Sequence, residues 1–201
     1  MARKELLPQD VTAICDTREQ RPLDLAPMKT LRTGLDTGDY SIAGLEDVVT
    51  VERKSLPDLL QCVGQERERF DREMHRILAF PHKMLVIEAT WGAIRAGEWR
   101  QKVHANAVAG SLLGWMSKGI PVFFATDHDM AGGIVRHFLF LSARRRWLEA
   151  SAMLPHLKIV GDKQCKDSPD SAPGVASPAP TETKKSVTAA LIAPKKSDKL
   201  T

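Results

Sequence analysis

The sequence predicts an α/β fold in which a mixed sheet is flanked by helices. Short apolar runs rich in β-branched residues, which are typical of strands, dominate the first third of the chain. Further along, two more such runs alternate with stretches whose apolar residues recur every three or four positions, as on one face of a helix. A group of strands followed by alternating helices and strands indicates a sheet covered by helices.

The strands are predicted where short apolar runs stand between turn residues. The run VTAIC at 11–15 precedes the polar stretch DTREQRP, and glycines and aspartates mark turns before a short strand at 40–42. The run LEDVVTVERK alternates apolar and polar residues, so a third strand is expected from about Val48. The continuous apolar runs KMLVIEA and PVFFAT predict two buried strands, at 83–89 and 121–126.

Four helices are expected, over 56–63, 65–79, 105–118 and 128–149. Pro57 suits the first turn of the first helix, and Asp127 can cap the last one. The stretch at 91–106 is read as a long connection. In the last helix, three residues at four-residue spacing are expected to face the core or a dimer seam: Met130, Ile134 and Phe138.

The composition excludes several classes of protein. Of the 201 residues, 43% are hydrophobic and 27% are charged, and no apolar run is long enough to span a membrane. The start, MARKELLPQD, shows no signal peptide. Cys15, Cys62 and Cys165 are too few and too far apart for a zinc site or a disulfide framework. We therefore expect a cytoplasmic protein, associated with the nucleoid if it is bacterial.

The chain is predicted to divide into a domain over 8–150 and a tail over 160–201. The segment DSPDSAPGVASPAPTETKKS has no hydrophobic periodicity, and it is predicted to be disordered because it buries too little apolar surface. The net charge is +4, and the last 47 residues hold eight lysines and five acidic residues. The domain is therefore nearly neutral, so any binding of nucleic acid to it requires local basic patches.

The end of the third strand carries the pattern VERKSLPD. Because side chains alternate along a strand, Glu52 and Lys54 point to one face and Arg53 points to the other. A carboxylate that holds a divalent cation, beside an ammonium group that supports negative charge, suits metal-assisted cleavage of a phosphodiester. Since Mg²⁺ commonly takes more than one carboxylate, Asp16 and Asp39 at other strand ends are candidates to join Glu52.

Single motifs of this kind also arise by chance, but the ordered set resembles a known family. DTRE at 16–19, GDY at 38–40 and ERKSLPD at 52–58 are similar to motifs of the nuclease domain of the xeroderma pigmentosum group F (XPF) endonucleases. The resemblance covers about residues 10–145. It implies a restriction-endonuclease-like fold and an enzyme that cuts branched, flap or fork DNA, leaving a 5′-phosphate and a 3′-hydroxyl.

The resemblance also implies a role for each motif residue. Mg²⁺ is the expected cofactor, with Mn²⁺ as a substitute, and Lys54 is the expected catalytic lysine. Arg53 is expected to form a salt bridge behind the site, and Asp58 either holds a neighbouring cation or is an acid favoured by the helix dipole. The implied metal ligands are Asp16, Asp39 and Glu52. The supporting members of the catalytic set are Arg18, Glu19, Arg53 and Asp58.

Basic side chains near the motifs are candidates for contact with DNA phosphates: Arg67, Arg69, Arg95, Arg100 and Lys102. The alternative for the helix at 65–79 is a solvated face with ion pairs one turn apart. The alternative for the connection at 91–106 is a loop pinned to the core by its tryptophans. The resemblance further implies a homodimer or a partner subunit.

Two other functions stay open from the sequence. One is a nuclease-fold subunit that binds DNA, or acts as a scaffold in a repair or recombination complex, without cutting. The other is a nuclease of the same fold with a different DNA substrate, such as a junction resolvase or a replication-fork enzyme. The intact set of acids with the Glu-x-Lys pair favours a metal-dependent DNA endonuclease.

Overall fold

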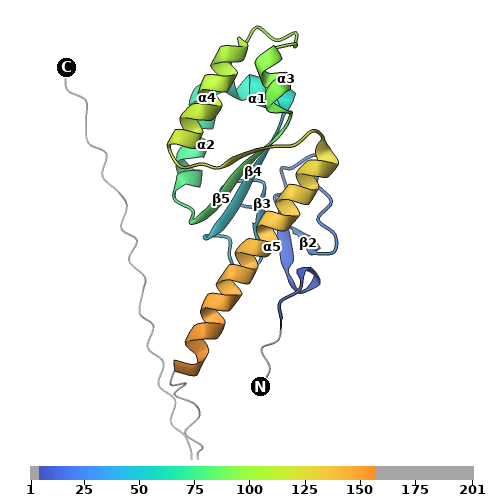
Figure 1. Cartoon of the computed structure of the whole chain (residues 1–201), viewed down its shortest axis with the longest axis vertical. Coiled ribbons are helices and arrows are strands. Elements are labelled where there is room, and N and C mark those ends of the chain that lie inside the picture. The colour runs from blue at the N-terminus through green and yellow to red at the C-terminus, as the bar shows by residue number, and fades with distance from the viewer. Residues whose placement is uncertain (1–4, 157–201) are drawn as a thin grey trace, which may run out of the picture. The chain divides into compact units, whose positions relative to one another are not determined.

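A computed structural model describes residues 5–156 as a six-stranded mixed sheet with helices on both faces (Figure 1). The strands are β1 (Thr12–Cys15), β2 (Lys29–Arg32), β3 (Tyr40–Ile42), β4 (Val49–Ser55), β5 (His82–Glu88) and β6 (Val122–Phe124). The helices are α1 (Leu56–Val63), α2 (Arg67–Leu78), α3 (Trp91–Ala96), α4 (Ala105–Ser117) and α5 (His128–Met153). The predicted tail over 160–201 lies outside the described residues.

The strand order is β2-β1-β3-β4-β5-β6. Strand β3 is antiparallel to both of its neighbours, whereas the other pairs are parallel. Helices α1 and α2 connect β4 to β5, and α3 and α4 connect β5 to β6, as parallel neighbours require a crossover. Within residues 5–156, no helix combines the length and the apolar composition that a membrane span needs.

The two faces of the sheet bury separate apolar clusters. On β5, Met84 and Val86 belong to the cluster that includes Val135 and Leu139 of α5. The intervening residues Leu85 and Ile87 belong to the cluster formed with α1, α2 and α4. Figure 1 shows α5 crossing one face of the sheet and continuing beyond its edge.

Strand β4 follows the same alternation, and this places the motif residues. Val51 packs in the α5 cluster, so Arg53 lies on that side, where it pairs with Glu88. Glu52 and Lys54 therefore face α1 and α2. Consistent with this, the Lys54 ammonium lies 5.2 Å from the centre of the Phe70 ring on α2.

Most predicted elements are confirmed, and the differences lie at the edges of the sheet. Strand β2 was not predicted, because all four of its residues are exposed and it joins the sheet through main-chain pairing with β1. The run at 121–126 forms an edge strand and not a buried one, since Phe123 is 48% exposed. Helix α3 lies within the predicted connection, between the cap Thr90 and Gly97.

The last helix also differs in the face that it buries. Asp127 caps it as predicted, because its Oδ1 accepts a hydrogen bond from the Met130 amide at 2.8 Å. Of the three residues predicted to face the core or a dimer seam, Ile134 and Phe138 pack against the core, whereas Met130 is exposed and is not part of it. The buried stripe starts one residue later, and its small members let the helix lie close to the sheet. The stripe consists of Ala131, Val135, Leu139 and Ala143.

Candidate active site

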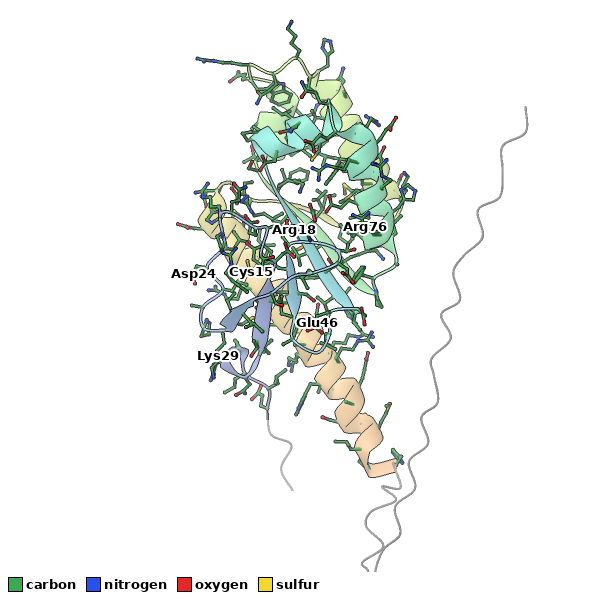
Figure 2. The ribbon with its side chains drawn as sticks, turned by 180° about the vertical axis from the view of Figure 1, so that it is seen from behind. Cys15, Arg18, Asp24, Lys29, Glu46 and Arg76 are labelled. Carbon is green, nitrogen blue, oxygen red and sulfur yellow. The ribbon has the colours of Figure 1, made fainter. Side chains whose placement is uncertain are left out.

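A polar cleft of about 610 Å³ opens where β4 ends and α1 begins. Its walls come from β4, α1, α2 and the loops before β3 and after β1. Its lining brings together every predicted catalytic residue except Asp16, namely Arg18, Glu19, Asp39, Glu52, Arg53, Lys54 and Asp58, and it adds Arg69 and Glu73 of α2. Figure 2 views the molecule from the side opposite to that of Figure 1, with labels on Arg18 in the loop after β1 and on Arg76 in α2.

Main-chain hydrogen bonds fix Asp39 beside β4. Its amide donates to the Val51 carbonyl at 2.8 Å, and its Oδ2 accepts from the Arg53 amide at 2.8 Å. A carboxylate held by the backbone of the next strand cannot swing away from the cleft. Asp39 therefore stands next to the strand that carries Glu52, as a metal site that includes both carboxylates would require.

Glu52 and Lys54 form a buried ion pair. The Glu52 side chain is 1% exposed, and its Oε1 accepts from the Lys54 ammonium. Its other oxygen, Oε2, is buried and has no hydrogen-bond partner among the described residues. A buried carboxylate oxygen without a partner is costly, and such an atom commonly marks the place of a bound ion or water.

The electrostatics of the cleft follow from this crowding. Burial, and then the charge of Asp39, raises the pKa of Glu52. Burial also raises the pKa of Asp39, although the ammonium of Lys54 opposes the shift. Burial alone would lower the pKa of Lys54, but the carboxylates of Glu52 and Asp39 outweigh it and raise the value. Lys54 therefore stays protonated, and a cation beside the two acids would favour their ionised forms.

Asp16, the third predicted metal ligand, does not line the cleft, and local hydrogen bonds engage its carboxylate. Its Oδ1 accepts from the Arg18 amide at 2.8 Å and from the Arg18 guanidinium at 2.7 Å, while Oδ2 accepts from the Leu35 amide at 2.6 Å. Burial opposes ionisation of Asp16, but these hydrogen bonds outweigh it and lower its pKa. Within residues 5–156, no three His, Cys, Asp or Glu side chains gather around one metal position. Asp16 instead supports Asp39, because its amide donates to the Asp39 carbonyl at 2.8 Å.

A buried ion network lies behind the cleft, as predicted for Arg53. The Arg53 guanidinium lies 3.1 Å from Glu19 Oε2 and 3.5 Å from Glu88 Oε1. Glu88 also bonds His128 Nδ1 at 2.6 Å, which ties the network to the start of α5. The sequence analysis missed Glu88 and His128; the available signal was an acid at the end of a buried strand next to β4.

Asp58 acts at the start of α1, in agreement with the second of its two predicted roles. Its amide donates to Ser55 Oγ at 3.3 Å, and that hydroxyl donates to Asp58 Oδ2 at 2.6 Å. This reciprocal pair caps the helix. No hydrogen bond or ion pair joins Asp58 to Lys54 or Arg53 within the part of the chain that the structure describes.

The five predicted DNA-contact residues divide into two groups. Arg67 pairs with Asp71 at 3.9 Å, Arg69 pairs with Glu66, and Arg95 bonds Asn106 at 3.2 Å. This favours the alternative of a solvated, ion-paired face for the two residues of α2, although Arg69 still lines the cleft. The other two, Arg100 and Lys102, line a neighbouring groove.

Gly38 is required by the approach of its loop to β4. Its φ is +80°, and a Cβ there would lie 2.2 Å from Thr50 Oγ1 and 3.0 Å from the Val51 carbonyl oxygen. Gly38→Ala is therefore expected to lower the free energy of unfolding by about 2–4 kcal/mol, through strain and overpacking. Gly34→Ala is the control, because no atom lies within 4 Å of its added Cβ. Urea unfolding measures the stability of both variants. Equal stabilities would contradict the requirement for glycine at position 38.

The chain is similar to a known protein family and to solved structures. Residues 15–138 match the ERCC4 domain. XPF from Aeropyrum pernix has a similar structure, with a TM-score of 0.54 and 18% identity over 75% of this chain and 75% of that chain. Its complex with DNA gives a TM-score of 0.49 and 16% identity over 71% of this chain and 73% of that one. No curated protein sequence matches. The chain belongs to the ERCC4 domain family and has the restriction-endonuclease-like fold of an XPF-type nuclease domain.

Proposed function

We propose that this protein is a metal-dependent DNA endonuclease that hydrolyses phosphodiester bonds at branched, flap or fork DNA. One observation carries the proposal. Glu52, whose buried Oε2 has no hydrogen-bond partner among the described residues, lines the same cleft as Asp39 and the protonated Lys54. Membership of the ERCC4 domain family supports a DNA endonuclease, and the branched substrate and the metal are the parts that we add.

The donor set fits a hard divalent cation. Mg²⁺ is bound through one or two carboxylates together with waters and substrate phosphate oxygens, and Asp39 and Glu52 would supply those carboxylates. Glu52 Oε2 would then gain the partner that it lacks among the described residues. Mn²⁺ is expected to substitute. When bound, the ion would polarise the scissile phosphate and lower the pKa of the attacking water.

The protein groups around the cleft would orient and stabilise the reacting phosphate. The Lys54 ammonium is held between Glu52 Oε1 and the Phe70 ring, so it is pre-aimed at the charge that develops on the phosphate oxygens. In the reaction, water adds to phosphorus and loses a proton to solvent. The bond from phosphorus to the 3′ oxygen breaks, and that oxygen takes up a proton. The products are a 5′-phosphate and a 3′-hydroxyl.

A second subunit is part of the proposal. Leu141 and Leu148 of α5 are exposed apolar side chains that line one open hollow, and grouped apolar surface commonly marks an interaction site. We propose that a second copy of the chain or a partner protein covers it, and analytical ultracentrifugation of the purified protein distinguishes the two. Because its proposed substrate is DNA, we propose a cytoplasmic location, associated with the nucleoid if the protein is bacterial.

The substrate is tested with a panel of end-labelled DNAs: duplex, single strand, 3′ flap, 5′ flap, fork and four-way junction. Each is incubated with Mg²⁺, Mn²⁺ or EDTA. The proposal predicts cutting near the branch of at least one structure in the presence of either metal, and none in EDTA. Binding of DNA without cutting under every condition would instead indicate a silent scaffold subunit.

A further inference from the structure

A second groove adjoins the cleft and shares part of its wall. It has a volume of about 770 Å³ and lies between α1 and the loop at 98–103. Asp58 and Gln61 line both hollows, so the groove begins where the cleft ends. The groove is distinct in chemistry, because the metal pair, Asp39 and Glu52, does not line it.

The groove offers two basic side chains that the protein leaves unpaired. Arg100 and Lys102 are exposed and line it. Within residues 5–156, neither makes an ion pair or a side-chain hydrogen bond, unlike Arg67, Arg69 and Arg95, each of which has a partner. Cations without a carboxylate partner are available to an anionic ligand, whereas a paired arginine must first give up its partner.

The loop that carries these cations is fixed against the core. The Trp99 indole Nε1 donates to the Val103 carbonyl at 2.8 Å, and both residues pack on the buried cluster. Gly64, at the end of α1, allows this close approach, because a Cβ there would lie 3.1 Å from Val103 Cγ2. The main chain that carries Arg100 and Lys102 is therefore held in place, so that only their side chains have to be ordered when a ligand binds.

We propose that this groove binds the phosphate backbone of the DNA on one side of the cut, with Arg100 and Lys102 as positioning residues. The inference rests on the proposed function, because the strand has to pass through the neighbouring cleft. Only one of the groove's charged side chains is acidic, Asp58, and it is engaged with Ser55. Two amides, from Gln65 and Gln101, can bond phosphate or sugar oxygens without regard to sequence, whereas the amide of Gln61 already donates to Glu66 Oε1. The groove would thus fix the register of the strand and not its sequence.

The first test measures the affinity for a fluorescent flap DNA against salt concentration, in EDTA so that nothing is cut. The slope of log Kd on log salt counts the phosphates neutralised, at about 0.7 to 0.9 for each. The double variant Arg100→Gln, Lys102→Gln is expected to lower the slope by about 1.5 and to weaken binding at least about tenfold at moderate salt. Lys118→Gln, which removes an exposed charge outside both hollows, is the control and should keep the wild-type slope.

The second test locates the contact on the DNA. Neutral methylphosphonate linkages are placed one at a time on either side of the cut. Those within a short stretch on one side should weaken wild-type binding but leave the double variant unaffected, and the double variant should raise KM more than it lowers kcat. Equal slopes for wild type and double variant, with DNA still cut, would overturn this inference alone. A wild type that neither binds nor cuts DNA would overturn the proposed function as well.

Discussion

Asp39→Asn is expected to lower the rate of DNA cleavage about 100- to 1000-fold, the range for loss of one group that stabilises a transition state. The amide keeps the hydrogen bond from the Arg53 amide but removes one of the two charges proposed to hold the cation. Single-turnover cleavage of a labelled flap measures the effect. Asp36→Asn, an exposed acid in the same loop, is the matched control. A variant that retains a tenth of the wild-type rate would remove Asp39 from the metal site.

The same substitution is expected to stabilise the metal-free protein at neutral pH. Because burial raises the pKa of Asp39 in the folded state, the unfolded chain releases this proton at lower pH, and stability falls as pH rises from about 4 toward the folded pKa. Asparagine has no proton to release, so the gain at pH 7 should be on the order of 2–3 kcal/mol and should vanish near pH 4.

Thermal unfolding in EDTA across that pH range tests this stabilisation. Added Mn²⁺ should then raise the midpoint of the wild type and not that of Asp39→Asn, because a ligand stabilises only the state that binds it. A variant less stable than wild type throughout would show that Asp39 serves the fold and not the metal.

Arg53→Met is expected to cost about 3–5 kcal/mol of unfolding free energy, because it leaves the buried carboxylate of Glu19 without its cation and removes one of the two cations near Glu88, which keeps Arg21. Urea unfolding measures the loss. Arg145→Met is the matched control, since it breaks an exposed pair with Glu149 on α5 and should cost about 1 kcal/mol or less. Equal effects of the two substitutions would show that the network behind the cleft does not hold β4 in place.

The parts of the structure that depend on local pattern could be predicted from sequence. Alternation along β4 places Glu52 and Lys54 on one face and Arg53 on the other, and the structure confirms this division. Ser55, the cap of α1, and Asp127, the cap of α5, stand directly before their helices. In each case the determining contact lies within a few residues, so the sequence itself contains the signal.

The features that the sequence analysis did not predict depend on contacts that the local pattern does not show, most of them between segments far apart along the chain. Strand β2 pairs through its backbone alone, and its exposed side chains leave no periodic pattern. The motif predicts Asp16 as a metal ligand but does not reveal the hydrogen bonds from Arg18 and Leu35 that engage its carboxylate in the fold. Glu88 and His128 are 40 positions apart and meet only once β5 and α5 are packed. The spacing of such residues along the sequence does not predict that they will meet in the fold.

Cleavage by Lys54→Met tests the central claim most directly, namely that the cluster of Asp39, Glu52 and Lys54 cuts DNA. Lys54 lies in the cleft, 15% exposed, with its ammonium on Glu52 and over the Phe70 ring. We would compare the variant with wild type on one flap DNA, with Mg²⁺, at enzyme concentrations that saturate both. The account predicts a rate about 100- to 1000-fold lower, with unchanged affinity for DNA measured in EDTA. Cutting at the wild-type rate, or a wild type that cuts equally well in EDTA, would contradict it.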